Sequence, residues 1–274
     1  MKHRRNAHLI EAIFHKPWFI TASGYAAVRR LAEAKIRGEK EDWNGMMESG
    51  REPMEIDGNG IAHIEICGTL SKNVSPLEAC CGAYDYEWLE EDLENAMEAG
   101  VRGIWLEIDS PGGACEGCAE GADLIAQAAR KIPVVVYSDG TCASAAYNLA
   151  VSGTKLFGSQ SSTWGSIGTI IPWTDESAMW AEEGMEWSPI TNTGGVLKGA
   201  GMGPSLTAAQ RASLQQYVDD AFAQFKGNVL RNRLVPEEAM TGGAYLAPRA
   251  LEYKLIDAIL TESAAYEKLV ALVK

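Results

Sequence analysis

The stretch PVVVYSDGTCASAAYNLA, residues 133–150, combines three kinds of sequence within eighteen residues. The run PVVVY is typical of a buried strand, SDGT contains turn-forming residues, and ASAAYNLA predicts a helix of small side chains. One serine, Ser144, stands where the turn meets the helix. Two interpretations are open at this point. Ser144 is either a small residue that lets the helix pack closely or a nucleophile held at the end of a strand.

The same succession of strand, turn and helix recurs on both sides of this stretch. Further strands are predicted for IAHIEICGTL, GIWLEID, KLFGS, GSIGTIIPW and EWSPITN, and further helices for YEWLEEDLENAMEAG, EGCAEGADLIAQAARK, DESAMWAEEG and residues 207–233. Strands that are almost entirely apolar and that alternate with helices predict an α/β protein with a mostly parallel sheet flanked by helices. Sites in such sheets form at the carboxyl ends of strands, where DSPGG and DGTCAS stand.

Composition excludes several classes of protein. The chain has 274 residues, of which 46% are hydrophobic, and its formal net charge of −13 argues against general nucleic-acid binding. No apolar run approaches the roughly 18 residues of a membrane span, and no signal peptide is recognisable, so we expect a protein of the cytoplasm without a membrane anchor. Residues 1–58 are predicted to form a helical leader and a polar linker, and residues 59–274 the main domain.

The charge of the leader is opposite to that of the rest of the chain. The first 40 residues hold nine Lys and Arg against three Asp and Glu. Such a basic arm either contacts an acidic partner or is a solvated helix.

A nucleophilic serine needs a base, and the histidines are poorly placed to supply one. They are His3, His8, His15 and His63, all of which precede the alternating region or belong to its first strand. A Ser-His-Asp triad is therefore poorly supported, and the remaining candidate is a lysine that burial keeps neutral. Lys198, in the glycine-rich stretch NTGGVLKGAGMGP, is flanked by apolar residues. It is either this base or part of a solvated loop.

Two other motifs contain groups that could take part in chemistry. The turn SPGG offers the backbone N–H groups of Gly112 and Gly113 beside a helix start, where a developing oxyanion could be stabilised. Cys115 and Cys118 form a C-x-x-C pair, but no second pair or suitably spaced histidine accompanies it, so we expect no metal site. The pair is either a redox motif or two reduced thiols.

Taken together, these motifs resemble the S49 peptidase family, the group of signal peptide peptidase A and phage protease C. The matching segments are IEICGTL, GIWLEIDSPGG, VVVYSDGTCASAAYNLA, STWGSIGTI, GGVLKGAG and GGAYLAPRALEYKLIDAI, which cover roughly residues 60–260 in the order of the family. The opening HLIEAIFHKPWFITASGYAAVRRLAEAK resembles the leader of the phage capsid-maturation branch. Many members have S-G-G-Y where this chain has Ser144-Ala145-Ala146-Tyr147, and alanine keeps the backbone N–H.

The resemblance implies a ClpP/crotonase-type spiral fold and a Ser/Lys dyad without metal or cofactor. The nucleophile would be Ser144 and the general base Lys198, with Ser166 holding the lysine. Backbone N–H groups of Gly113 and Ala145 would form the oxyanion hole. The family also implies a homo-oligomeric ring.

The implied substrates are scaffold, portal or other capsid proteins, including self-cleavage of the leader, in the host cytoplasm or inside the prohead. Alternatives are a cytoplasmic prophage protease like signal peptide peptidase A, a non-catalytic capsid assembly protein, and a crotonase-like acyl-CoA enzyme.

Overall fold

A computed structural model describes residues 17–37, 51, 53–74, 78–79, 82–173, 175, 177–186, 188–200 and 205–273 of the chain. Most of the predicted leader, three of the four histidines, and Cys80 and Cys81 lie outside these residues. No helix within the described ranges is both long and apolar enough to cross a membrane. The division into 1–58 and 59–274 stays a prediction.

The largest sheet in the described part of the chain has six strands. Its order is β13 (Ala258–Ile259), β10 (Lys155–Gly158), β8 (Val134–Ser138), β6 (Gly103–Asp109), β3 (Ile61–Cys67) and β2 (Glu55–Ile56). All neighbouring strands are parallel except β2 with β3. The predicted mostly parallel α/β sheet is therefore confirmed.

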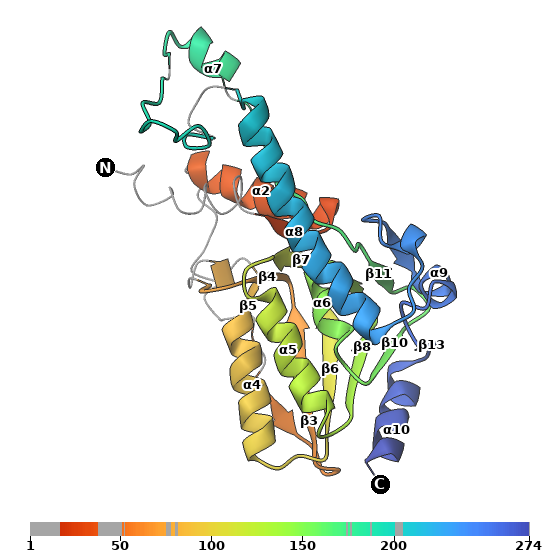
Figure 1. Ribbon diagram of the computed structural model, residues 1–274. Coiled ribbons are helices and arrows are strands. Elements are labelled where there is room, and N and C mark those ends of the chain that lie inside the picture. Colours follow the sequence, from red (N-terminus) through yellow and green to blue (C-terminus); the bar gives the residue numbers. More distant parts are fainter. Residues whose placement is uncertain are drawn as a thin grey trace.

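The chain winds into a spiral because one unit is repeated (Figure 1). Each unit is a long strand of the large sheet, then one or two short strands in a smaller sheet, then a helix. The units are β3 with β4 (Thr69–Ser71), β5 (Ala83–Asp85) and α4 (Tyr86–Glu98); β6 with β7 (Gly112–Ala114) and α5 (Cys118–Ala129); and β8 with β9 (Thr141–Ala143) and α6 (Ala145–Ala150). Each long strand joins the same side of the one before it, as expected of a ClpP/crotonase-type spiral.

Two smaller sheets complete the spiral. The strand order of the first is β1 (Trp18–Ile20), β7, β4 and β5. The strand order of the second is β12 (Ala244–Leu246), β11 (Thr163–Gly165) and β9. The first sheet is formed partly by the N-terminal strand β1, which precedes α2 (Ala22–Arg37). The carboxyl ends of β6 and β8 thus lead directly into the two turns that the sequence marked as candidate sites.

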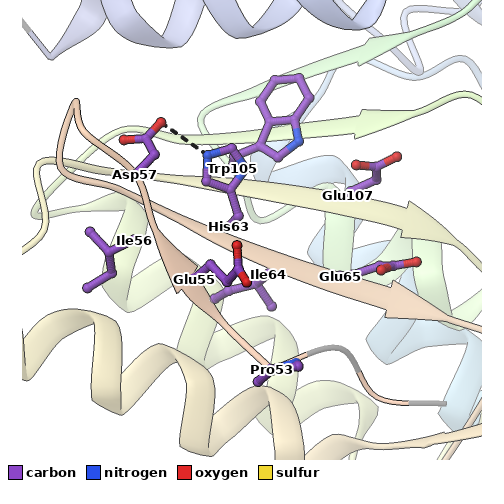
Figure 2. Close-up of a pocket in the computed structure, with 9 residues that line it drawn as sticks. All are labelled: Pro53, Glu55, Ile56, Asp57, His63, Ile64, Glu65, Trp105 and Glu107. Carbon is purple, nitrogen blue, oxygen red and sulfur yellow. Dashed lines mark hydrogen bonds and ion pairs between the residues drawn. The ribbon is translucent and has the colours of Figure 1, made fainter.

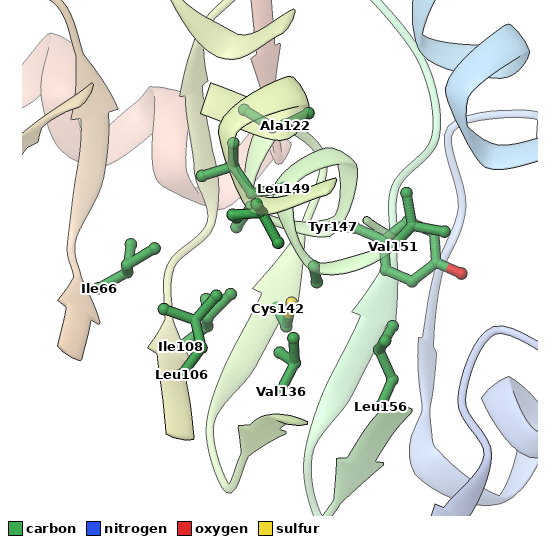
Figure 3. Close-up of a cluster of buried hydrophobic side chains, with 14 of the residues drawn as sticks. Ile66, Leu106, Ile108, Ala122, Val136, Cys142, Tyr147, Leu149, Val151 and Leu156 are labelled. Carbon is green, nitrogen blue, oxygen red and sulfur yellow. The ribbon is translucent and has the colours of Figure 1, made fainter. Parts of the chain in front are cut away.

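Helices cover both faces of the large sheet because its strands are apolar on both sides. Leu106 and Val136 belong to the main core together with buried residues of α4, α5 and α6. Figure 3 shows them with Ala122 of α5 and Leu149 of α6. Their strand neighbours Trp105 and Val135 belong to a second cluster with α10 (Glu262–Leu272). Successive side chains of a strand point to opposite faces, so a run such as PVVVY contributes to both clusters.

The longest described helix, α8 (Ala208–Asn232), connects the body to a projecting segment. It starts with a capping box, in which the Thr207 hydroxyl accepts from the Gln210 amide and the Gln210 side chain accepts from the Thr207 amide. Its last turns pack on α6, whereas its first turns, α7 (Ser177–Glu182) and residues 188–200 extend away from the sheets (Figure 1). We call residues 177–200 the arm. The chain ends with α9 (Ala247–Glu252), β13 and α10.

Three expectations for local structure were wrong. In GSIGTIIPW only Gly165 lies in a strand, because Gly165 and Ser166 have φ of 106° and 51° and turn the backbone. The described residues of EWSPITN form no strand, because they lie in the exposed arm, where no described strand pairs with them. Strand β1 was not predicted at all.

Candidate active site

Ser144 occupies a strained turn between β9 and α6. Its φ of 58° and ψ of −119° lie in a region that residues with a Cβ avoid. The turn is held by two backbone hydrogen bonds, from Ser144 N to Gly165 O at 2.7 Å and from Asn148 N to Ser144 O at 2.9 Å. Strain of this kind survives only where the surrounding structure fixes it, and it is common at nucleophiles between a strand and a helix.

The hydroxyl of Ser144 is buried without a hydrogen-bond partner. The residue has no exposed surface, and its Oγ accepts from and donates to no described atom. An unsatisfied buried hydroxyl costs free energy. Among the described residues the hydroxyls of Tyr84, Ser138 and Thr169 share this state, so it is the combination with backbone strain that sets Ser144 apart. The arrangement fits a nucleophile better than a small residue that serves only helix packing.

The SPGG turn lies directly beside Ser144. Gly112 has φ of 101°, and a Cβ built on it would be 2.8 Å from the Cβ of Ser144. A Cβ on Gly113 would be 1.9 Å from the carbonyl oxygen of Leu70, so β7 can approach β4 only with glycine there. Two N–H groups are expected to stabilise an oxyanion. That of Gly113 belongs to strand β7 next to Ser144, and that of Ala145 belongs to the first turn of α6, where amides have no acceptor within the helix.

Ser166 is also brought to Ser144. Strands β9 and β11 are parallel, with Ala143 opposite Gly165, so the two serines that follow them are neighbours. Ser166 is buried, and its N–H donates to Gly243 O at 2.7 Å. The family resemblance thus selected a residue whose backbone lies beside that of Ser144.

Lys198 is not brought to Ser144 within one chain. Its side chain is exposed in the arm, and its carbonyl oxygen accepts from Gln210 Nε2, in the first turn of α8, at 3.1 Å. The helix that follows Ser144 instead meets the other end of α8, where Asn228 Nδ2 donates to Asn148 O at 2.9 Å. At about 1.5 Å per residue, these two contacts are separated by about 27 Å of helix. The predicted dyad stays a prediction.

Comparison with known proteins identifies the family of the chain. The model of peptidase family S49 matches residues 126–274, which is more than half of the chain. The chain belongs to peptidase family S49. The match includes Ser144, Ser166 and Lys198, whereas the SPGG turn precedes it.

The chain is similar to proteins of phages and bacteria. The chain is 28% identical to the head-tail preconnector protein GP5 of Enterobacteria phage P21, over 96% of this chain and 57% of that protein. It is 30% identical to the capsid assembly protease C of Escherichia phage lambda, over 47% of this chain and 29% of that protein. An enoyl-CoA hydratase structure from Shewanella pealeana is 11% identical with a TM-score of 0.48, covering 85% of this chain and 78% of that one. The chain thus spans 57% of the phage P21 protein and 29% of the phage lambda protein.

His63, the only histidine among the described residues of this S49 chain, lies away from Ser144. His63 is on β3, where its ring stacks on Tyr266 of α10 with centroids 5.6 Å apart and its Nε2 is 3.2 Å from Asp57 Oδ2. Figure 2 shows it in a pocket of about 390 Å³ on β2, β3 and β6, together with Trp105. This pocket lies on the α10 face of the sheet. His63 is therefore a strand residue packed under α10 and is not placed to serve Ser144.

The C-x-x-C pair of this S49 chain forms no disulfide, and Cys118 is buried whereas Cys115 is half-buried. Cys115 and Cys118 are free, and burial raises the pKa of both thiols, that of Cys118 to about 12. Cys118 Sγ accepts from Asn148 Nδ2 at 3.2 Å. These are thiols rather than thiolates at neutral pH, which favours the structural interpretation over a redox motif. Within the described ranges no group of three or more His, Cys, Asp or Glu side chains could hold a metal ion.

One segment next to the S49 site was missed by sequence reasoning. Strand β1 pairs with the SPGG strand β7 and buries Phe19 beside α8. The available signal was the run WFI after Pro17, three residues that favour strands immediately before a helix.

Proposed function

We propose that the chain is a serine endopeptidase with Ser144 as nucleophile and Lys198 as general base. The observation that carries the proposal is the strained, buried and unpartnered Ser144, set between Ser166 and the SPGG strand. This arrangement supplies a nucleophile, a neighbouring hydroxyl that can orient a base, and amides for an oxyanion.

The reaction follows from these roles. Neutral Lys198 takes the proton of Ser144 Oγ, which attacks the carbonyl carbon of a peptide bond, and N–H groups of Gly113 and Ala145 stabilise the oxyanion. The protonated lysine then gives its proton to the leaving amine as the C–N bond breaks. Water hydrolyses the resulting ester and regenerates the serine. Ser166 holds the amine of Lys198 in place during both steps.

A neighbouring copy of the chain supplies Lys198 in this proposal. Within one chain the arm carrying Lys198 is attached at the far end of α8, away from Ser144. The arm also exposes large apolar side chains, which suits a surface that is covered in an assembly; they are Met179, Met185, Ile190, Val196 and Leu197. Burial between two copies would remove water from the lysine and favour its neutral form.

The proposed substrates are scaffold, portal or other capsid proteins of a phage head. Support comes from the names of the similar phage proteins, a head-tail preconnector and a capsid assembly protease. The protease would then act in the host cytoplasm or inside the prohead. A cytoplasmic prophage protease like signal peptide peptidase A is the second candidate within the same family.

Mixing two inactive variants tests the dyad and the shared site together. Ser144→Ala and Lys198→Ala should each abolish cleavage of an unfolded protein such as casein, and the wild type should react at Ser144 with a fluorophosphonate probe. If each site takes its serine and lysine from different copies, an equal mixture assembled from unfolded chains should regain about a quarter of wild-type activity, because one site in four receives both groups.

The control is a mixture of Ser144→Ala with Ser144→Gly, which cannot regain activity. Wild-type-like cleavage by Ser144→Ala alone would contradict the proposed function. Two inactive single variants whose mixture stays inactive would support the dyad but contradict its division between copies. A wild type that neither cleaves nor reacts with the probe would favour a non-catalytic capsid protein of the S49 fold.

A further inference from the structure

Strand β1 lies in a slot between two other backbone segments. On one side it pairs antiparallel with β7, with Phe19 opposite Gly113 and Ile20 opposite Gly112. On the other side Trp18 and Ile170 exchange both backbone hydrogen bonds, at 2.8 and 3.0 Å. A short stretch of extended chain is thus held by main-chain bonds on both edges, which is how proteins hold an extended peptide ligand.

The register of β1 directs one carbonyl group at a candidate oxyanion donor. Opposite residues in an antiparallel pair alternate between pairs that exchange hydrogen bonds and pairs that exchange none. Thr21 N donates to Pro111 O at 2.9 Å and Cys115 N donates to Pro17 O at 3.4 Å. The pairs Thr21–Pro111 and Pro17–Cys115 are therefore of the hydrogen-bonded kind. The pair Phe19–Gly113 lies two residues from each of them, so it is of the same kind. The N–H of Gly113 therefore faces the carbonyl oxygen of Phe19.

The same carbonyl group lies beside Ser144. A Cβ built on Gly112 would be 2.2 Å from the oxygen of Phe19 and 2.8 Å from the Cβ of Ser144, so these two atoms flank one small space. Ser144 is fully buried and its Oγ has no partner within the described residues. The peptide group of Phe19 is thus next to the nucleophile and on the donor that would stabilise an oxyanion.

Side chains of β1 fill two separate places. Phe19 belongs to the main core, where its ring packs on Phe225 of α8 with centroids 5.0 Å apart. Trp18 and Ile20 point to the other side and form a cluster of their own with α2. The space that holds the Phe19 ring, against Phe225, is therefore shaped for one large apolar side chain.

From these contacts we infer that β1 occupies the peptide-binding cleft of the protease as a built-in, substrate-like strand. Phe19 stands on the acyl side of the position at which a bond would be cut, and its subsite, with Phe225 as one wall, selects large apolar residues. The inference rests on the proposed function for the role of Ser144. Because β1 belongs to the same chain, its effective concentration is high, and it keeps other peptides out until it leaves.

Peptide binding to inactive chains tests this occupancy. Ser144→Ala and the double variant Ser144→Ala/Phe19→Ala are titrated with a fluorescent peptide of residues 15–24, HKPWFITASG. Removing the Phe19 ring weakens the hold of β1 on the cleft, so the double variant should bind the peptide about tenfold or more tightly than the single variant. A peptide with Asp in place of the phenylalanine should bind neither. Phe19→Leu replaces Phe19→Ala if the latter does not fold.

The matched control is Ser144→Ala/Phe157→Ala, which removes an equally buried phenylalanine from the α10 face of the sheet. It should bind the peptide no better than Ser144→Ala. Equal binding by the two folded double variants would overturn the inference, because the gain would then reflect general loosening. Equal and weak binding by all three folded chains would overturn it as well, as would tight binding of the Asp peptide. Since no chain in this experiment cleaves, failure of the proposed chemistry would appear only in the separate activity assay, where an inactive wild type counts against that chemistry only if Phe19→Ala, which loosens β1, is inactive as well.

Discussion

The backbone of Ser144 is strained because the residue has a Cβ. At φ of 58° and ψ of −119° the Cβ is crowded by its own main chain, whereas glycine has no such atom. The Gly165 carbonyl and the start of α6 hold the residue there. The hydroxyl is therefore presented at a fixed place at the expense of local stability.

This strain predicts different stabilities for two inactive variants. Ser144→Gly and Ser144→Ala both lose Oγ and should both be inactive, but only the glycine variant loses the Cβ. Its free energy of unfolding should exceed that of the alanine variant by about 1 kcal/mol, measured by urea denaturation. At Ala143, which lies in strand β9, the same change from alanine to glycine should destabilise the protein instead. An alanine variant at position 144 as stable as the glycine variant would contradict the role of strain.

At the scale of single residues, local motifs marked the candidate site residues whose backbones the fold brings close together. Ser144 and Ser166 each follow a short strand, β9 and β11, whose parallel pairing places their ends side by side. Gly113 lies in β7, the short strand that follows β6. Lys198 belongs to no such strand. Its place depends on the arm and, in our proposal, on a second chain, and neither is encoded in spacing within one sequence.

Among the elements, α8 decides where the arm stands, and its C-terminal end is fixed by an ion-pair cluster. Arg233 donates to Asp257 Oδ2 at 2.7 Å, and the Leu156 amide donates to the same oxygen at 2.8 Å. Burial opposes ionisation of Asp257, but the hydrogen bonds from Arg233 and Leu156 and the charges of Arg233 and Lys155 outweigh it. The pKa of Asp257 is therefore lowered from its ordinary value.

Asp257→Asn should accordingly destabilise the fold in a pH-dependent manner. The loss should be about 1–3 kcal/mol at neutral pH, because Arg233 keeps its charge without a charged partner. A carboxylate whose pKa is lowered on folding stabilises above its unfolded pKa of about 3.9, and this contribution disappears as pH falls through the folded value. Urea denaturation of wild type and variant should thus converge below about pH 3.9. Glu252→Gln, which breaks the exposed pair with Arg249, should cost less than about 0.5 kcal/mol.

Sequence patterns predicted the elements that are buried and missed those that depend on their neighbours. The strands β3, β6, β8 and β10 and the helices α4 and α5 have apolar patterns that their own residues specify. The segment 186–192 has a strand-like composition but no described strand to pair with. Strand β1 shows the reverse, because three residues become a strand only where β7 and Ile170 offer free edges.

The whole molecule combines a compact spiral with an arm whose apolar side chains have no described cover. The net charge of −13 would keep such chains apart unless specific contacts bring them together. The arm holds the proposed base at one end of α8, and Ser144 lies near the other. A ring in which each arm reaches the next body would bury the apolar surface and complete every site in one step.

A single charge placed in the arm should therefore disrupt assembly and activity together. The side chain of Ile190 is 98% exposed in the arm, and that of Leu234 is 80% exposed beyond the end of α8. Both changes, Ile190→Asp and Leu234→Asp, introduce a carboxylate at an exposed position, so neither should alter the stability of the single chain by more than about 0.5 kcal/mol. In sedimentation velocity at micromolar concentration, Ile190→Asp should shift the protein toward the monomer and reduce cleavage in proportion, whereas Leu234→Asp should leave both unchanged. A wild type that is strictly monomeric yet fully active would contradict the shared site, and an Ile190→Asp variant that assembles and cleaves normally would exclude this part of the arm from the interface.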